Sequence, residues 1–169
     1  VIASGGTADA IRAASVDAFR LSKITGYEHL LGGRVKTLHP AVYAAILARR
    51  GIDADGDDLK RLHVEPIDMV AVDLYPFPPV GAEAGDDLPV ELIDVGGVSL
   101  IRAAAKNHQA VLALSSADQF DEAAAVIEAG AGSVSKRYAA VMAAQAFHRV
   151  SEYDRRIADR IDQYLEQPN

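Results

Sequence analysis

Four short apolar runs recur along the chain and predict its β-strands. They lie at Val1–Ala3, Ala18–Leu21, Ile67–Tyr75 and Val111–Leu114. The third run contains the uninterrupted apolar stretch Met69–Val72, which predicts a strand buried on both faces, as in a parallel sheet. The fourth run predicts another buried strand.

Stretches rich in alanine and other strong helix formers separate these runs and predict helices. Pro40 suits the first position of one helix, and Gly130 ends another. A single helical turn is expected at 90–94, before a break at Gly96 and Gly97. The expected helices span 8–14, 40–49, 59–63, 98–107, 118–129 and 133–164, the last interrupted near residue 151. This alternation predicts a three-layer α/β fold with a mainly parallel sheet.

Three segments lack both helical and strand periodicity and are expected to be loops. Segment 30–38 carries glycines and two cations, and segment 53–58 is acidic and is expected to be a surface turn. Segment 79–89 is rich in Gly, Pro and acidic residues and is expected to be mobile. Loops of this length often carry function, so the cationic segment is of most interest.

Composition narrows the class of protein. The 169 residues suit one α/β domain, and 17 Lys and Arg against 24 Asp and Glu give a formal charge of −7. That charge opposes nucleic-acid binding, and no apolar run is long enough to span a bilayer, so neither nucleic acid nor membrane is an expected partner. The chain has no Cys, which fits a reducing, cytoplasmic location. It opens at Val1 inside an expected strand, so we expect residues upstream.

Two segments could hold a phosphate. Ser4-Gly5-Gly6-Thr7 lies between a strand and a helix, where exposed amides and the helix dipole favour an anion, although many such turns are only tight connections. Arg34, Lys36 and Thr37 offer two cations and a hydroxyl, with Arg34 and Lys36 on the same side if the backbone is extended. The alternative is that both charges are solvated.

Other polar residues follow strands or end helices. Segment 73–75 and Ser115 each follow an expected strand, where ligands of open α/β sheets bind. Lys106 could complement a helix dipole while His108 caps a carbonyl, or Lys106 could share a pocket with Asp94 and pass protons. His39 and His63 lack metal-ligand spacing, so no metal is expected.

Five motifs in order resemble the IMP cyclohydrolase domain of the bifunctional purine biosynthesis proteins. They are Ser-Gly-Gly-Thr at 4–7, Leu-Gly-Gly-Arg-Val-Lys-Thr-Leu-His-Pro at 31–40, Leu-Tyr-Pro-Phe at 74–77, Ile-Asp-Val-Gly-Gly at 93–97 and Arg-Ala-Ala-Ala-Lys-Asn-His at 102–108. The resemblance covers nearly the whole chain. It implies a single domain at 1–169 with a methylglyoxal-synthase-like fold, and closure of formamidoimidazole carboxamide ribotide (FAICAR) to IMP with loss of water, without a cofactor or metal.

The resemblance also implies roles for individual residues. The candidate catalytic residues are Lys36, Tyr75, Asp94 and Lys106, with Lys106 as proton donor or acceptor. The implied substrate contacts are Ser4, Gly5, Gly6, Thr7, Arg34, Lys36, Thr37, Val72, Asp73, Asp94 and Val95. A nucleotide is therefore the expected small-molecule partner, and the implied protein partner is a transformylase domain or protein. The long alanine-rich helices have flat faces that could support a homodimer.

The chain departs from the family pattern at three points. Asp73 stands where an Asn is usual, which exchanges an amide donor for a carboxylate, and Tyr43 stands where a His is common. The family's first strand, its helix and a phosphate motif are expected upstream of Val1, and the transformylase is not within these residues.

A non-catalytic nucleotide- or phosphate-binding module, similar to the allosteric domain of carbamoyl phosphate synthetase, is the main alternative function. Methylglyoxal synthase shares the fold, but the motifs at 34–40 and 104–108 argue against it.

Overall fold

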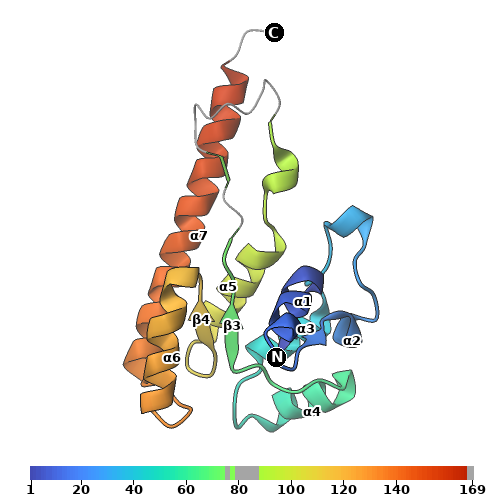
Figure 1. Ribbon diagram of the computed structural model, residues 1–169, viewed down its shortest axis with the longest axis vertical. Coiled ribbons are helices and arrows are strands. Elements are labelled where there is room, and N and C mark those ends of the chain that lie inside the picture. Colours follow the sequence, from blue (N-terminus) through green and yellow to red (C-terminus); the bar gives the residue numbers. More distant parts are fainter. Residues whose placement is uncertain (75–76, 79–87, 167–169) are drawn as a thin grey trace. The chain divides into compact units, whose positions relative to one another are not determined.

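The computed structural model describes residues 1–74, 77–78 and 88–166 and divides the chain into two compact units (Figure 1). Unit one is Val1–Asp68 and unit two is Met69–Asn169. Each unit contains parallel strands, which confirms the α/β class. In the described residues, however, the strands form two separate two-stranded sheets instead of one continuous sheet. Only two or three residues of each apolar run form a β-ladder. Helices account for most of the described residues.

Unit one begins with the βαβ arrangement that its sequence predicts. Strand β1 (Ile2–Ala3) pairs in parallel with β2 (Phe19–Arg20), and helix α1 (Gly5–Ala13) connects them. The Arg12 side chain donates from Nε to the carbonyl oxygen of Ala18 at 2.8 Å. This bond connects the end of α1 to the residue that precedes β2. A side-chain hydrogen bond therefore stabilises the short sheet in addition to its backbone ladder.

Helix α3 (Pro40–Leu47) supplies the apolar interior of unit one, and the short helix α2 (Ser22–Thr25) packs against it. Pro40 occupies its first turn, as predicted, and His39 caps it by accepting a bond from the Ala41 amide at Nδ1, 3.2 Å away. A capping role explains this histidine without any metal. The buried residues of α3 are Ala41, Val42, Ala45 and Ile46.

The expected acidic turn at 53–58 is wrong, because these residues form the first half of helix α4 (Asp53–Leu62). Asp53 and Asp55 lie in its first turn, where negative charge complements the helix dipole. Asp57 pairs with Lys60 at 2.8 Å, one helical turn later. Dipole and ion pairs together outweigh the poor helix propensity of aspartate and glycine.

Unit two contains the second parallel pair, β3 (Met69–Ala71) with β4 (Leu112–Leu114). All three residues of β4 are buried, as predicted. In β3 only Val70 is buried and Met69 is 47% exposed, so the prediction of a strand buried on both faces is wrong for β3. The 3-10 turn η2 (Val90–Leu92) and helix α5 (Gly96–Lys106) follow, and Gly96 and Gly97 begin the helix instead of breaking the chain before it.

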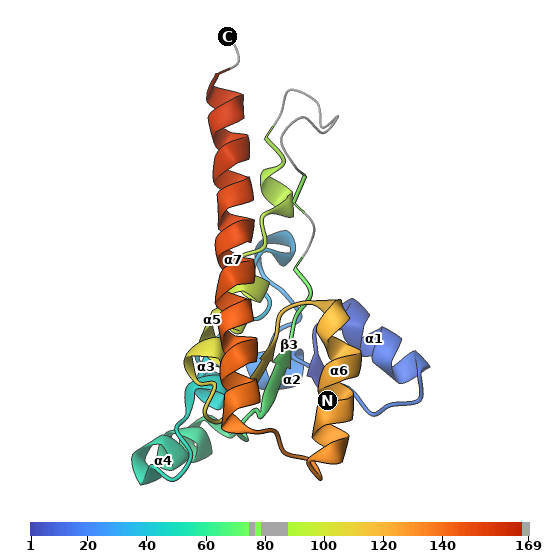
Figure 2. The same ribbon diagram turned by 90° about the vertical axis from the view of Figure 1, so that its left-hand side faces the viewer.

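The C-terminal part of unit two is dominated by one long helix, α7 (Lys136–Leu165), shown along its length in Figure 2. It runs without the expected interruption at Ser151, and the Ser135 hydroxyl caps its start by accepting from the Tyr138 amide at 3.1 Å. The 3-10 turn η3 (Ala117–Gln119) and helix α6 (Phe120–Ala129) precede it. One core cluster consists of Leu112, Leu114, Ala123 and Met142.

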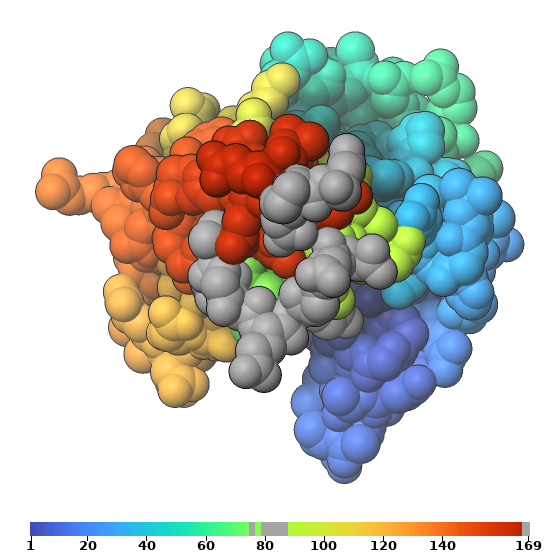
Figure 3. Space-filling model, turned by 90° about the horizontal axis from the view of Figure 1, so that it is seen from above, coloured from blue at the N-terminus to red at the C-terminus, as the bar shows by residue number. Residues whose placement is uncertain are grey.

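Helix α7 buries fewer side chains in its C-terminal half than in its N-terminal half. Its C-terminal half, red in Figure 3, carries mostly exposed side chains, but Tyr153 and Arg160 are buried. Among the apolar side chains of this helix, Met142 and Val150 are buried, whereas Val141 and Phe147 are more than 40% exposed. Among the described helices, α7 included, none combines the length and apolar character needed to cross a membrane.

Candidate functional site

The Ser4–Thr7 turn of unit one forms the N-terminus of α1. Ser4 has an extended backbone and its side chain makes no capping bond, while Gly5, Gly6 and Thr7 form the first helical turn. The first amides of a helix have no partners within that helix. A Cβ atom at Gly5 or Gly6 would meet no described atom within 4 Å. The turn therefore combines helix-start amides with room around Gly5 and Gly6, two features that an anion site requires.

The cationic segment of unit one, residues 30–38, is a tight loop. Leu30 and Val35 close it by exchanging backbone hydrogen bonds of 2.8 and 3.3 Å. Arg34 has a helical backbone, so the extended geometry that would put Arg34 and Lys36 on the same side is absent at Arg34. Lys36 folds back instead, with Cε 3.3 Å from where a Cβ of Gly33 would lie. Both cations are exposed.

Thr37 helps to connect this loop to helix α3. Its carbonyl oxygen accepts a 2.9 Å bond from the amide of His39, the residue that caps the helix. Its side chain is partly exposed. The backbone that follows Lys36 is therefore anchored to a regular element.

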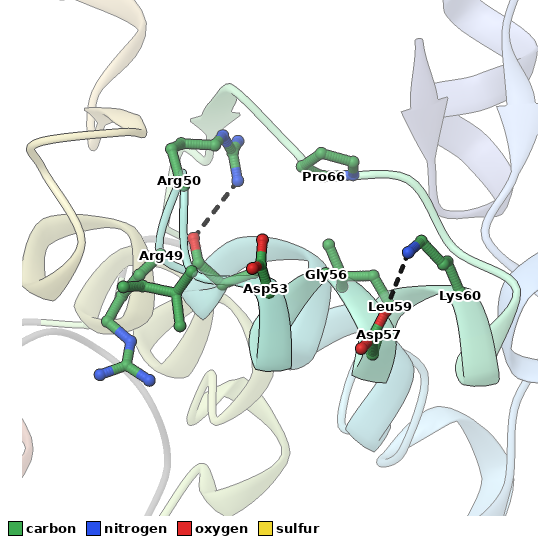
Figure 4. A pocket seen from close by; sticks show the side chains of 11 residues that line it. Arg49, Arg50, Asp53, Gly56, Asp57, Leu59, Lys60 and Pro66 are labelled. Atoms are coloured by element: carbon green, nitrogen blue, oxygen red, sulfur yellow. Dashed lines mark hydrogen bonds and ion pairs between the residues drawn. The ribbon is translucent and has the colours of Figure 1, made fainter.

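A pocket of about 490 Å³ in unit one lies beside α4 and contains none of the predicted site residues (Figure 4). Its charged side chains are largely paired with one another or with nearby groups. Lys60 pairs with Asp57 at 2.8 Å, and Arg50 donates to the carbonyl oxygen of Ala48 at 3.3 Å. A third cation, Arg49, is held by Asp55 at 2.7 Å. The pocket therefore offers little unpaired charge to a ligand.

In unit two, the side chains of Val72 and Asp94 both lie close to Gly97. The Gly97 amide donates to Oδ1 of Asp94 at 2.7 Å, so the carboxylate caps the first turn of α5. A Cβ at Gly97 would lie 2.5 Å from Oδ2 of Asp94 and 3.0 Å from Cγ1 of Val72. A side chain at this position would therefore force the Asp94 carboxylate to move. The exposed side chain of Val95 lies in the same turn.

A buried tyrosine of α7 holds the backbone of the same segment. The Asp94 amide donates to the Tyr153 hydroxyl at 2.7 Å, and this hydroxyl donates to the carbonyl oxygen of Leu92 at 3.2 Å. Tyr153 is only 6% exposed, and burial raises the pKa of its phenol. Sequence reasoning missed Tyr153 because it lies 59 residues from Asp94 and no local pattern connects them.

Asp73 lines a pocket of about 240 Å³ in unit two. Two arginines of α7 share it, Arg149 and Arg156, and Arg156 pairs with Glu152 on the same helix. Asp73, where the resemblance expects an Asn, therefore lines a pocket that also contains two cations and the second carboxylate, Glu152. The complete lining is Asp73, Leu74, Phe77, Arg149, Glu152, Tyr153 and Arg156.

Lys106 lies in the last turn of α5, whereas Asp94 lies just before the first. At 1.5 Å per residue, the helix separates its ends by about 15 Å. The Asp94 carboxylate and Lys106 therefore lie near opposite ends of α5. The exposed Lys106 complements the negative end of the dipole, and His108 lies with Nδ1 3.1 Å from the carbonyl oxygen of Ala105.

The two remaining candidates from the sequence are Tyr75 and Ser115. Tyr75 lies outside the described residues. Ser115 follows β4 as predicted, but it is 1% exposed and its amide donates to Oε1 of Gln119 at 2.7 Å. Gln119 in turn donates to Gln145 at 2.6 Å. Ser115 is thus part of a structural network and is not open to a ligand.

Two family models match this chain. The model described as an MGS-like domain matches residues 1–109, and the model described as AICARFT/IMPCHase bienzyme matches residues 104–169. The first contains every residue of the candidate site except the α7 residues. The second begins inside α5 and includes all of α7, and with it Tyr153.

Curated relatives and a solved structure agree with these matches. The chain is 42% identical over 156 residues to the bifunctional purine biosynthesis protein PurH of Synechococcus sp. (strain CC9605), covering 91% of this chain. It is also 42% identical over 159 residues to PurH of Cutibacterium acnes, covering 94% of this chain. The chain spans 30% of the length of each of these relatives. The crystal structure of ForH superimposes with a TM-score of 0.83 and 32% identity, over 95% of this chain and 85% of that one.

Proposed function

Because the chain belongs to the MGS-like domain family and is homologous to the IMP cyclohydrolase domain of PurH, we propose that it closes FAICAR to IMP. In this proposal residues 1–169 belong to one cyclohydrolase domain. A transformylase domain or protein supplies the formylated substrate, and the reaction takes place in the cytoplasm. The observation that carries the proposal is the convergence of Val72 and Asp94 at Gly97, where the resemblance expects nucleotide contacts.

The reaction forms one bond and eliminates one water molecule. The carboxamide nitrogen of FAICAR attacks the formyl carbon, and the formyl oxygen becomes an alkoxide and then a hydroxyl. The carboxamide nitrogen gives up one of its two protons, which ends on the formyl oxygen. The formamide nitrogen then gives up its proton as a C=N bond forms in the new ring and the hydroxyl leaves as water. A poor amide nucleophile reacts faster when it is held in near-attack geometry and when a cation meets the developing oxyanion.

The proposal assigns these tasks to separate residues. The α1 N-terminus, formed by Ser4–Thr7, binds the phosphate together with Arg34 and Thr37. Lys36 stabilises the developing oxyanion, and Lys106 transfers the proton to or from the reacting atoms. Asp94 orients the carboxamide, and Tyr75 contacts the purine ring. Val72, Asp73 and Val95 line the nucleotide site.

The positions of Asp94 and Lys106 limit how they act. Since the length of α5 separates them, the two groups act on different atoms of the substrate and exchange protons only through substrate or water. Gly97 already donates to the Asp94 carboxylate, whose remaining acceptor positions are available to a ligand amide.

Ultraviolet-monitored conversion of FAICAR to IMP by the full chain tests the proposal. Lys106→Ala should lower kcat by about 100-fold or more, the usual size of a general acid–base contribution. The matched control is Lys60→Ala, because Lys60 is also an exposed lysine in the last turn of a helix. Lys60→Ala should leave kcat unchanged. Equal activity of wild type and Lys106→Ala would overturn the catalytic assignment.

A non-catalytic nucleotide-binding module is the second candidate. It is favoured by the distance between Lys106 and Asp94 and by the cap that Asp94 already forms on α5. Folded wild-type chain that binds IMP in calorimetry, yet turns over no FAICAR, would support this candidate against the enzyme.

A further inference from the structure

We infer that Tyr153 is a positioning residue for Asp94, acting through its hydroxyl on the backbone of the segment that carries the carboxylate. This inference rests on the proposed function, because it gives Asp94 a task in nucleotide binding and ring closure. Tyr153 itself is 6% exposed and lies on helix α7, far from Asp94 in the sequence. Its role is to hold the carboxylate in place.

The segment that carries Asp94 has little regular structure of its own. The 3-10 turn η2 ends at Leu92 and helix α5 begins at Gly96, so Asp94 lies in the connection between them. Its amide donates to the Tyr153 hydroxyl at 2.7 Å. The same hydroxyl donates at 3.2 Å to the carbonyl oxygen of Leu92, two residues earlier. One side chain thus satisfies a donor and an acceptor of the connection.

Asp94 is consequently held at two points. Tyr153 holds its backbone, and the Gly97 amide holds Oδ1 of its carboxylate at 2.7 Å. The second bond limits the rotation of the side chain, but it moves with the start of α5. The first bond sets where the Cα of Asp94 lies relative to α7. Without the hydroxyl, two backbone groups would lose their partner and the connection would have to shift.

The tyrosine ring has a separate structural role. It contacts Phe77 edge-on, with the ring centroids 6.5 Å apart at 78°. The ring also lines the pocket that contains Asp73 and Leu74. A phenylalanine at 153 would keep this packing and remove only the hydroxyl, so packing and positioning can be tested separately.

The matched control is Tyr138, a second tyrosine of α7. Its hydroxyl is buried and has no hydrogen-bond partner in the described part of the chain, and burial raises its pKa. Tyr138→Phe and Tyr153→Phe are the same chemical change in the same helix. Only the second change removes bonds to the Asp94 segment.

The experiment is a double-mutant cycle on the full chain, with kcat and KM measured for FAICAR closure. Tyr153→Phe should lower kcat by about tenfold, the size expected for a lost hydrogen bond that shifts a reacting group. Tyr138→Phe should not change kcat. In the Asp94→Asn background, Tyr153→Phe should change kcat by less than about twofold, because its effect is transmitted through the carboxylate. The same loss in both backgrounds, or no loss in wild type, would overturn the inference.

Hydrogen exchange separates failure of this inference from failure of the proposed function. Tyr153→Phe should accelerate exchange at the Asp94 amide whether or not the chain is an enzyme, and Tyr138→Phe should not. If the wild-type chain turns over no FAICAR, the proposed function fails, and the cycle is repeated with the Kd for IMP as its readout. Unchanged exchange at Asp94 overturns the inference, as does a wild-type chain that neither reacts with nor binds these nucleotides.

Discussion

The candidate residues of unit one and of unit two are held in different ways. In unit one, Ser4–Thr7 and Lys36 are presented by backbone conformation, at a helix start and in a glycine loop, with exposed or partly exposed side chains. In unit two, the Asp94 segment is bonded on both sides, by Tyr153 and by Gly97. The first arrangement leaves groups available for a ligand, whereas the second fixes one group precisely.

This difference suggests how the two units contribute. Exposed cations and free helix amides suit a charged phosphate, which tolerates small errors of position because charge acts over several ångströms. A group that orients a reacting amide needs closer placement, since an error of about 1 Å can cost 100-fold in rate. Substitutions that remove Asp94 or displace Lys36 should therefore alter kcat, whereas substitutions in the Ser4–Thr7 turn should alter KM.

The most severe test of this comparison is Asp94→Asn. It removes the charge while an amide oxygen can still accept from Gly97, so the fold should persist and kcat should fall by about 100-fold or more. Asp94→Ala should additionally cost about 1 kcal/mol of unfolding free energy, through loss of the cap. FAICAR turnover and urea unfolding of both variants check this. Full activity of Asp94→Asn would show that its carboxylate has only a capping role.

Gly97→Ala should have the next largest effect. The added Cβ would lie 2.5 Å from Oδ2 of Asp94, so the carboxylate must move. We expect kcat/KM to fall by about 100-fold and the unfolding free energy by about 1 to 3 kcal/mol, as for other overpacked sites. The control is Gly56→Ala within α4, where a Cβ meets no described atom within 4 Å. It should increase stability slightly and leave turnover unchanged.

Gly33→Ala tests the loop of unit one. Gly33 has a φ of 105°, and a Cβ would lie 3.3 Å from Cε of Lys36. We expect a cost of about 1 to 3 kcal/mol from backbone strain and a fall in kcat of about tenfold or more, because the displaced Lys36 no longer meets the developing oxyanion. Gly32→Ala is the matched control, because Gly32 also has a positive φ but its Cβ would meet nothing within 4 Å. Gly32→Ala should lower stability without changing kcat.

The smallest expected effect is acid sensitivity at the start of α4. Asp55 accepts bonds from the Arg49 side chain and amide, which lower the pKa of its carboxyl from 3.8 to about 2. A lowered pKa stabilises the fold above 3.8, and this contribution is lost as the pH falls toward 2. Asp55→Asn should thus lower the urea midpoint at neutral pH, and its difference from wild type should shrink in acid.

Arg49→Gln provides the control for that titration. It keeps the carboxylate and removes the ion pair, so it should lower the urea midpoint at neutral pH and reduce the loss of stability between pH 3.8 and about 2. A difference between wild type and Asp55→Asn that stays constant from neutral pH to pH 2 would contradict the assignment.

Local patterns predicted most of the elements correctly. The Pro40 helix, the β1–α1–β2 unit and the buried strand β4 each follow from a signal within a few residues: a proline at N1, a glycine turn, or an uninterrupted apolar run. The acidic half of α4 was missed because aspartate and glycine are typical of turns. Its ion pairs at a spacing of three residues were present in the sequence and could have revealed the helix.

The sequence by itself determined the family, the class of fold and the identity of the candidate residues, because motifs and periodicity are properties of neighbouring positions. Only the tertiary structure decided how these residues are placed. It separated Lys106 from Asp94 by the length of α5, and it brought Tyr153 to the Asp94 backbone. Bonds between distant segments arise from packing of whole helices, and a one-dimensional pattern does not encode which side chain will satisfy an isolated backbone amide.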